Sequence, residues 1–243
     1  MRLLSGKSRR LLSQGTGALA VTLSACCAAL CLTGAGQLTH AGEMRAMPEQ
    51  EPTIIDEWAK VQVPEPPVLK PVKADPGTTA LLVLDMQKGN CNAERRPRCV
   101  ASIARVRALL GAARDAGAMV GYSLTSSAKV TDIREELPPR PGEPVVKSGV
   151  DKFFGTDLEK RLRGRGVQTV ILVGTSAHGA VLNTATGAAL RGFNVVVPVD
   201  GMSAGEAYAE QYTCWHLANG PGTRRHVTLT RINMIAFSEP ATE

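Results

Sequence analysis

Short apolar runs alternate with segments of helical periodicity from residue 78 to residue 238. The runs that predict strands cover residues 80–84, 118–124, 145–146, 170–173, 195–197 and 227–235. The segments that predict helices cover residues 100–116, 158–165, 181–191 and 208–217. Strands that are apolar on both faces and alternate with helices are typical of a parallel sheet covered on both sides. The pattern predicts an α/β domain, with a three-layer, Rossmann-like open parallel sheet.

A different pattern occupies residues 1–42. Residues 1–10 are basic, whereas residues 11–42 contain no formally charged side chain and are dominated by Leu, Ala, Val and Cys. This order is typical of a signal peptide, and residues 8–12 (SRRLL) are similar to a twin-arginine export motif. We therefore expect an exported protein, located outside the bacterial cytoplasm or at the cell surface.

The sequence leaves three outcomes open for this leader. Residues 23–26 (LSAC) are similar to a lipobox, in which Cys26 would be lipidated and become the new N-terminus. Cleavage after residues 39–41 (THA) is the second outcome. The third is a retained membrane anchor, although Gly, Ser and Thr make the run a weak membrane span.

Residues 43–77 form a third region, which is rich in proline and charge. Its strong apolar side chains are Ile54, Ile55 and Trp58. We expect an extended arm that packs partly on the domain or on a partner subunit. The sequence thus predicts a leader (1–42), an arm (43–77) and one domain (78–238).

The net charge of +6 lies largely in the leader, which contains Arg2, Lys7, Arg9 and Arg10 and no acidic residue. Without these four residues the net charge is +2. The one dense basic run, residues 160–165, lies at a predicted helix C-terminus, where cations complement the helix dipole. Aromatic residues are scarce, so the composition argues against nucleic-acid binding.

The cysteines beyond the leader are Cys91, Cys99 and Cys214. Cys91 and Cys99 are close enough in the sequence to close a small disulfide loop, which export would favour. Two free thiols are the alternative, and the sequence does not decide between them.

Two charged residues follow predicted strands directly. Asp85 ends the run at 80–84, and Lys147 follows Val145 and Val146. A carboxylate at the end of a buried strand is costly unless it is paired, so it is either functional or bonded within the structure. Asp85 and Lys147 are expected to form an ion pair beside the turn at residues 174–180, where an open α/β sheet presents its ligand site. An ordinary structural salt bridge is the alternative.

Three motifs in this order resemble the signatures of the isochorismatase-like, or cysteine hydrolase, superfamily. They are residues 82–87 (LVLDMQ), Lys147 followed by residues 153–158 (FFGTDL), and residues 174–185 (GTSAHGAVLNTA). The resemblance as a whole covers about residues 78 to 236. The resemblance implies the isochorismatase-like hydrolase fold, a homo-oligomer and a cis peptide between Thr175 and Ser176.

The resemblance also implies catalytic positions. In cysteine hydrolases the residue six positions after the motif glycine is the nucleophilic Cys, the Asp deprotonates it, the Lys supports the charge, and N–H groups of the turn hold the oxyanion. In this chain the Asp is Asp85, the Lys is Lys147, and the nucleophile position holds Ala180. Alanine cannot attack a substrate, so a covalent thiol intermediate at this position is excluded. Contacts to a small-molecule substrate are expected from Gln87, Phe153, Thr175, Ser176, His178 and Gly179.

Two functions fit this pattern. True isochorismatases have glycine in place of the Cys, preceded in the turn by Ala-His, and hydrolyse without a covalent intermediate; Ala177 and His178 are similar. Asp85 and Lys147 could support such general acid–base chemistry. The alternative is an exported, catalytically inactive protein that binds a small molecule. A replacement nucleophile, Ser176 or Thr175, ranks last because both precede the position of the thiol.

The nicotinamidase branch of this superfamily adds a metal site, built from an Asp-x-His pair and further histidines. Residues 86–177 contain no histidine. We therefore predict no metal and no cofactor.

Overall fold

The computed structural model describes residues 51–238 of the 243-residue chain. The described residues belong to two units, which are divided between Ala59 and Lys60. The described part of the first unit contains helix α1 (Ile54–Glu57), which begins at a capping box formed by Thr53 and Asp56. Ile54, Ile55 and Trp58 are exposed. The predicted leader lies outside the described residues.

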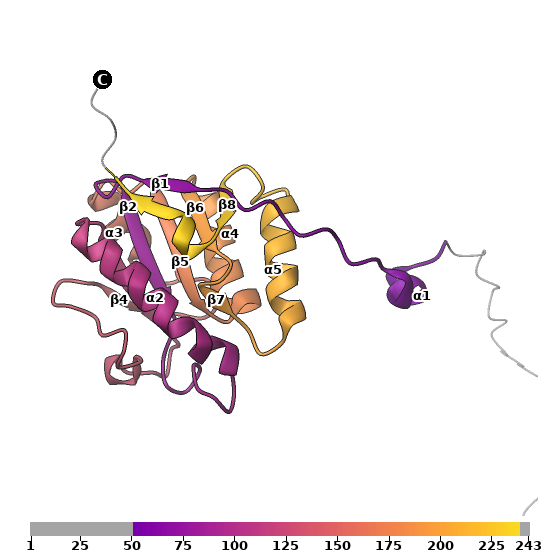
Figure 1. Ribbon diagram of the computed structural model, residues 1–243, viewed down its shortest axis with the longest axis horizontal. Helices are drawn as coiled ribbons and strands as arrows, with labels where there is room; N and C mark the ends of the chain where they lie inside the picture. The colour runs from indigo at the N-terminus through magenta and orange to yellow at the C-terminus, as the bar shows by residue number, and fades with distance from the viewer. Residues whose placement is uncertain (1–50, 239–243) are drawn as a thin grey trace, which may run out of the picture. The chain divides into compact units, whose positions relative to one another are not determined.

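The second unit contains a seven-stranded sheet in which every pair of strands is parallel, as the apolar runs predicted. Its order is β4-β3-β2-β5-β6-β8, and β7 pairs with the end of β5 (Figure 1). The strands are β2 (Thr79–Leu84), β3 (Met119–Leu124), β4 (Val145–Lys147), β5 (Thr169–Thr175), β6 (Asn194–Pro198), β7 (Met202–Ser203) and β8 (Val227–Thr230).

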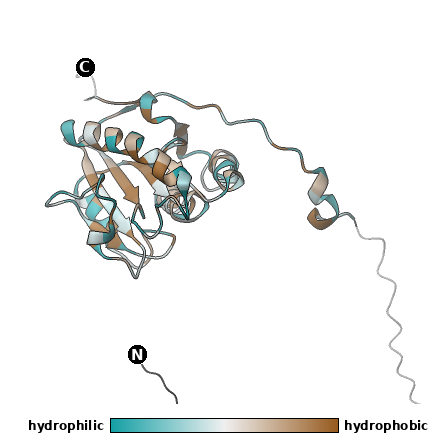
Figure 2. Cartoon of the chain, turned by 60° about the horizontal axis from the view of Figure 1, so that its bottom comes forward, coloured by the Kyte–Doolittle hydropathy of each residue, from teal (hydrophilic) through white to brown (hydrophobic). Residues whose placement is uncertain are grey.

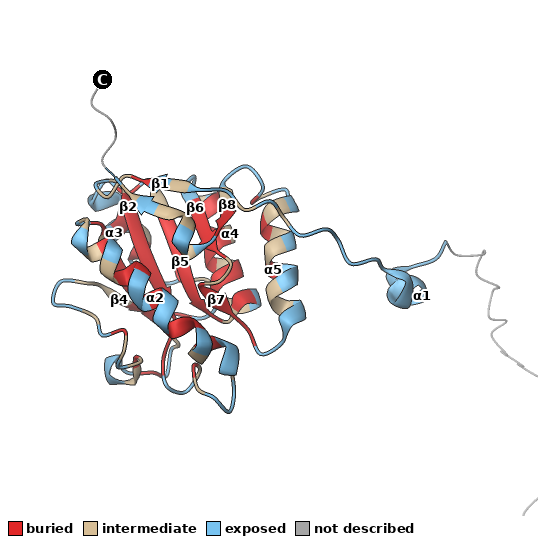
Figure 3. Cartoon of the chain, in the orientation of Figure 1, coloured by how far each residue is buried: buried red, intermediate tan, exposed pale blue. Residues whose placement is uncertain are grey.

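Helices cover both faces of this sheet and close two apolar cores. Helix α2 (Pro97–Asp115) packs on one face. The other face carries α3 (Leu158–Gly164), α4 (Leu182–Leu190) and α5 (Ala207–Asn219). The strands are buried along most of their length, whereas the helices expose their outer sides (Figure 3). Hydropathy follows the same division, with apolar residues in the strands and mixed residues in the helices (Figure 2).

Three boundaries differ from the predictions. The last predicted strand is interrupted by a 3-10 turn, η4 (Ile232–Met234), where the Ile232 N–H donates to Asp200 Oδ1 at 2.9 Å. The chain then forms β9 (Ile235–Phe237), which pairs in parallel with β1 (Val72–Ala74). This pairing shows that the end of the predicted arm packs on the domain. The predicted helix from 181 is preceded by a π-helical turn, η3 (Ala177–Val181). A second 3-10 turn, η2 (Val130–Asp132), lies between β3 and β4, where no element was predicted.

No helix within residues 51–238 is long and apolar enough to cross a membrane.

Candidate active site

Asp85 lies at the carboxyl end of β2, in a backbone conformation that brings its side chain toward the neighbouring strands. Its φ is 52°, in the left-handed region that Asp tolerates better than most residues. Gly174 of β5 is the register partner of Leu84, and a Cβ at Gly174 would overlap the Leu84 carbonyl oxygen. Only glycine therefore allows β5 to approach β2 so closely at this point.

The Asp85 carboxylate is 5% exposed and receives two side-chain hydrogen bonds. Ser123 Oγ, at the end of β3, donates to Oδ1 at 2.8 Å. Lys152 Nζ donates to Oδ2, also at 2.8 Å. Because both partners are donors, the structure presents Asp85 as a hydrogen-bond acceptor.

Lys152 is completely buried, and its ammonium group has an acceptor for each of its three protons. Besides Asp85, these acceptors are the carbonyl oxygens of Gly149, at 2.6 Å, and Ser148, at 3.4 Å. The ammonium is therefore occupied by protein groups. Its role is to balance and orient the Asp85 carboxylate.

Helix α4 determines where Lys152 lies. The Lys152 backbone N–H donates to Thr184 Oγ1 at 3.2 Å, and the same hydroxyl donates to the Val150 carbonyl oxygen at 3.3 Å. Gly187, one turn further along α4, faces the Asp151 carboxylate, and a Cβ there would lie 2.8 Å from Asp151 Oδ1. The absence of a side chain at Gly187 thus allows the loop before Lys152 to dock on α4.

The predicted pair of Asp85 with Lys147 is wrong. Lys147 is exposed at the end of the edge strand β4, and no ion pair in the described part of the chain involves it. Side chains alternate along a strand, so burial of Val146 directs Lys147 away from the core. The one sequence signal for Lys152 was a second lysine directly before Phe153.

The turn after β5 keeps the expected backbone. The Thr175–Ser176 peptide is cis, which confirms the prediction from the resemblance. The Ser176 carbonyl oxygen accepts hydrogen bonds from the N–H groups of Gly179, at 3.0 Å, and Val181, at 3.2 Å. A Cβ at Gly179 would lie 2.5 Å from Ser176 Oγ, so this tight turn requires glycine.

The predicted ligand contacts of this turn differ in accessibility. His178 is exposed, and Ser176 and Gly179 are partly exposed. Thr175 is buried, and its hydroxyl donates to the Ser203 carbonyl oxygen at 3.1 Å. Ala180 is 3% exposed and belongs to the apolar core on the α4 face. The turn thus presents backbone and polar groups but no thiol.

The two remaining predicted contacts serve the structure. Gln87 is buried and bonds Thr125 twice, with Nε2 donating to Oγ1 at 2.8 Å and Oε1 accepting from the N–H at 3.2 Å. Phe153 is buried against Phe193, with ring centroids 5.9 Å apart, and the Arg191 guanidinium covers its ring. Phe153 thus packs in the core on the α4 face, and its contact with a substrate stays a prediction.

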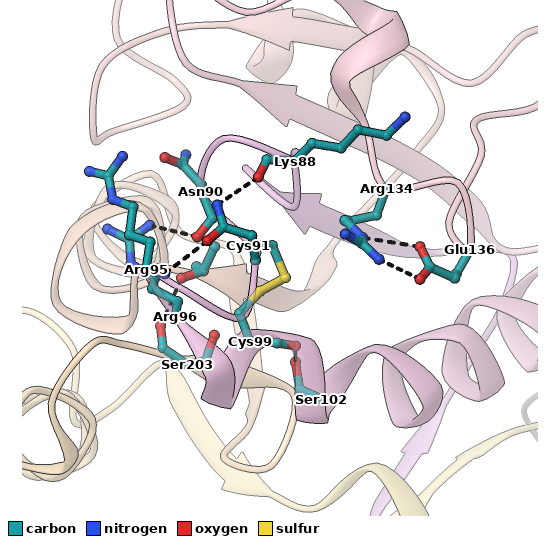
Figure 4. Close-up of a disulfide and its surroundings, with 12 residues drawn as sticks. Lys88, Asn90, Cys91, Arg95, Arg96, Cys99, Ser102, Arg134, Glu136 and Ser203 are labelled. Atoms are coloured by element: carbon teal, nitrogen blue, oxygen red, sulfur yellow. Dashed lines mark hydrogen bonds and ion pairs between the residues drawn. A yellow bond between two sulfur atoms is a disulfide. The ribbon is translucent and has the colours of Figure 1, made fainter.

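The loop from β2 to α2 contains a disulfide between Cys91 and Cys99, which decides the alternative that the sequence left open (Figure 4). The same loop carries Arg96, whose side chain is partly buried. Burial is the main reason why the pKa of Arg96 is lowered; Arg95 lowers it further, and the Asp85 carboxylate acts in the opposite direction. The sequence did not indicate Arg96 as a site residue, because nothing in its local pattern distinguishes it from Arg95.

No group of three or more His, Cys, Asp or Glu side chains within residues 51–238 is arranged to hold a metal ion.

Comparison with known proteins agrees with this architecture. The family model described as isochorismatase domain matches residues 79–228. The uncharacterized isochorismatase family protein YecD of Escherichia coli O157:H7 is 44% identical over 68 residues, which are 28% of this chain and 35% of that protein. The maleamate amidohydrolase of Pseudomonas putida is 29% identical over 146 residues, covering 49% of this chain and 68% of that enzyme.

A solved structure shows the same fold at lower identity. The N-carbamoylsarcosine amidase of Thermoplasma acidophilum superimposes with a TM-score of 0.56 at 22% sequence identity. The alignment covers 64% of this chain and 97% of that structure.

Proposed function

Because this chain belongs to the isochorismatase family, we propose that it hydrolyses a small molecule by direct attack of water, without a covalent enzyme intermediate. The observation that carries the proposal is the buried ion pair between Asp85 and Lys152. Burying two charges is expensive, and such a pair is weak evidence for stability alone. Here the pair lies at the carboxyl edge of the sheet, where open α/β folds bind their ligands.

Asp85 is the group that moves the proton in this proposal. Both side chains that contact its carboxylate donate to it, so it is set to accept a proton in the first step. As the water oxygen attacks the electrophilic carbon of the substrate, Asp85 takes one water proton and later returns it to the leaving group. Backbone N–H groups of the turn after β5 stabilise the oxyanion that forms.

Lys152 acts through Asp85. Its three protons are engaged by protein oxygens, so it holds the carboxylate in place and does not contact the substrate. This role replaces the one predicted for Lys147.

A second candidate is an exported binding protein without activity. It is favoured by Ala180, which stands where cysteine hydrolases have their nucleophile. The two candidates share a small-molecule ligand and differ only in turnover.

The deciding experiment incubates the purified full chain with isochorismate, maleamate and N-carbamoylsarcosine, and follows products by mass spectrometry. An Asp85→Asn variant, which keeps the side-chain shape, is compared with Asp115→Asn, which removes an exposed carboxylate at the end of α2. Turnover of one compound that is lost in Asp85→Asn and kept in Asp115→Asn would support the hydrolase. Binding of these compounds without turnover by the wild type would support the binding protein.

A further inference from the structure

Arg96 differs from the other partly buried arginines. Four arginines within residues 51–238 are partly buried, and three of them bond a carboxylate: Arg114 with Glu143, Arg134 with Glu136, and Arg191 with Glu159. For Arg96, the fourth, the described residues contain no carboxylate within ion-pair distance. A partly buried charge without a counter-charge is unfavourable, so this position needs an explanation.

The protein supplies little to the Arg96 guanidinium. Its Nη1 donates to the Asn90 carbonyl oxygen at 3.5 Å, which is long for a hydrogen bond. The charge of Asp85 reaches Arg96, as the opposing effect on its pKa shows, but Asp85 bonds Lys152 and Ser123 instead. Arg96 thus has most of its guanidinium donors without a partner among the described residues.

Ser203 provides an independent sign of a ligand. Its side chain is 1% exposed, and Ser203 Oγ is a buried polar atom without a hydrogen-bond partner. Ser203 belongs to β7, which contacts α2, the helix that Arg96 caps, and Ser203 is the register partner of Thr175 in the turn after β5. Figure 4 draws Ser203 and Arg96 among the residues around the disulfide, on the same side of it in this view. An orphaned hydroxyl beside an unpaired guanidinium is the donor set of an anion site.

We infer that Arg96 and Ser203 form a subsite that binds a carboxylate group of the substrate, beside the turn after β5. The inference rests on the proposed function for the identity of the ligand as a substrate. The planar guanidinium matches a carboxylate in two parallel hydrogen bonds. Arg96 supplies a single positive charge to this subsite, because Lys152 is already paired with Asp85, and a single charge suits a monoanion. A phosphate dianion would need a second cation to balance its charge.

The disulfide prepares this subsite. Cys91 and Cys99 close a loop with a sequence separation of 8, and Arg96 lies inside it as the N-cap residue of α2. The Arg96 N–H donates to the Asn92 carbonyl oxygen at 2.9 Å, which fixes its backbone within the loop. Arg95 is exposed. The neighbouring arginine is therefore a matched control.

The test measures binding of butyrate to the full chain by NMR titration, with neutral butyramide and inorganic phosphate as comparison probes. We expect butyrate to bind more tightly than either. Arg96→Gln should weaken butyrate binding about tenfold or more, because a charge-assisted bond is lost. Ser203→Ala should weaken it roughly two- to tenfold. Arg95→Gln should leave it unchanged, and Arg96→Lys should retain part of it.

Three results would overturn the inference: equal affinity for butyrate and butyramide, equal loss in Arg95→Gln and Arg96→Gln, or phosphate binding as tight as butyrate. The melting temperature of each variant without ligand shows whether it folds. Asp85→Asn separates this inference from the proposed function. If that variant keeps turnover, the proposed proton transfer through Asp85 fails. If butyrate binding in the same variant still depends on Arg96, the carboxylate subsite stands.

Discussion

The Lys152 ammonium lies 2.8 Å from the Asp85 carboxylate, although the lysine that the sequence motif indicates is Lys147, five positions earlier. Replacing each lysine in turn therefore tests which of the two pairs with Asp85. Replacing Lys152 by Met leaves Asp85 buried without a counter-charge, which should cost about 3–5 kcal/mol of unfolding free energy. Lys147→Met changes an exposed side chain and should cost less than about 0.5 kcal/mol. Urea denaturation measures both values.

Equal costs for the two variants would contradict this assignment. So would a Lys152→Met protein that is as stable as the wild type while Asp85→Asn is destabilised. The double variant Lys152→Met with Asp85→Asn should recover part of the loss, because the unpaired charge is then removed.

The two lysines also show how far the sequence determines the site. The apolar runs predicted the parallel sheet, and the position of Asp85 at the end of β2 followed from the run before it. The choice between Lys147 and Lys152 depends on contacts with α4, through Thr184 and Gly187, that are remote in sequence. Strand alternation at Val146 was the one local argument against Lys147.

Other differences have the same origin. Residues 231–235 are apolar enough for a continuous strand, but the hydrogen bond from Ile232 to Asp200 turns the chain before β9. Arg96 resembles Arg95 in the sequence and differs from it only in its folded surroundings. Local patterns therefore predicted the elements, whereas side-chain partners required the tertiary structure.

Removal of the disulfide should lower stability measurably. The double variant Cys91→Ser with Cys99→Ser frees a short loop in the unfolded chain, for an expected cost of about 2–3 kcal/mol. Differential scanning calorimetry with and without dithiothreitol checks this value. The reductant should lower the melting temperature of the wild type and leave that of the double variant unchanged; a wild type that does not respond to reductant under unfolding conditions would contradict the prediction.

Alkaline pH should weaken the fold through Cys214 on α5. Burial, with a smaller contribution from Glu210, raises the pKa of this thiol from its ordinary value of 9.0 to about 11. The unfolded chain therefore loses this proton at lower pH than the folded chain does. The contribution is fully present below pH 9 and is lost as the pH rises toward 11.

The measurement is the unfolding free energy between pH 8 and about 11.5, a window set by the two pKa values. Cys214→Ser should show a shallower decline than the wild type. Tyr122, whose pKa burial raises to about 12, is retained in both proteins and accounts for a shared loss at the upper end. Identical slopes for wild type and Cys214→Ser would show that the thiol does not contribute.

A thiol introduced at Ala180 should recover covalent chemistry. Ala180 occupies the position of the nucleophile in cysteine hydrolases, within the π-helical turn η3 that follows β5, and Asp85 is present as a proton acceptor. Ala180→Cys incubated with maleamate or N-carbamoylsarcosine should form an acyl adduct at residue 180, detected by peptide mass spectrometry after acid quenching.

Ala185→Cys, at another buried alanine of the same core, is the matched control and should form none. Adding Asp85→Asn to Ala180→Cys should abolish the adduct, because no group then deprotonates the thiol. An adduct that persists without Asp85, or that forms equally at residue 185, would mean that the ion pair of Asp85 and Lys152 does not serve proton transfer at this turn.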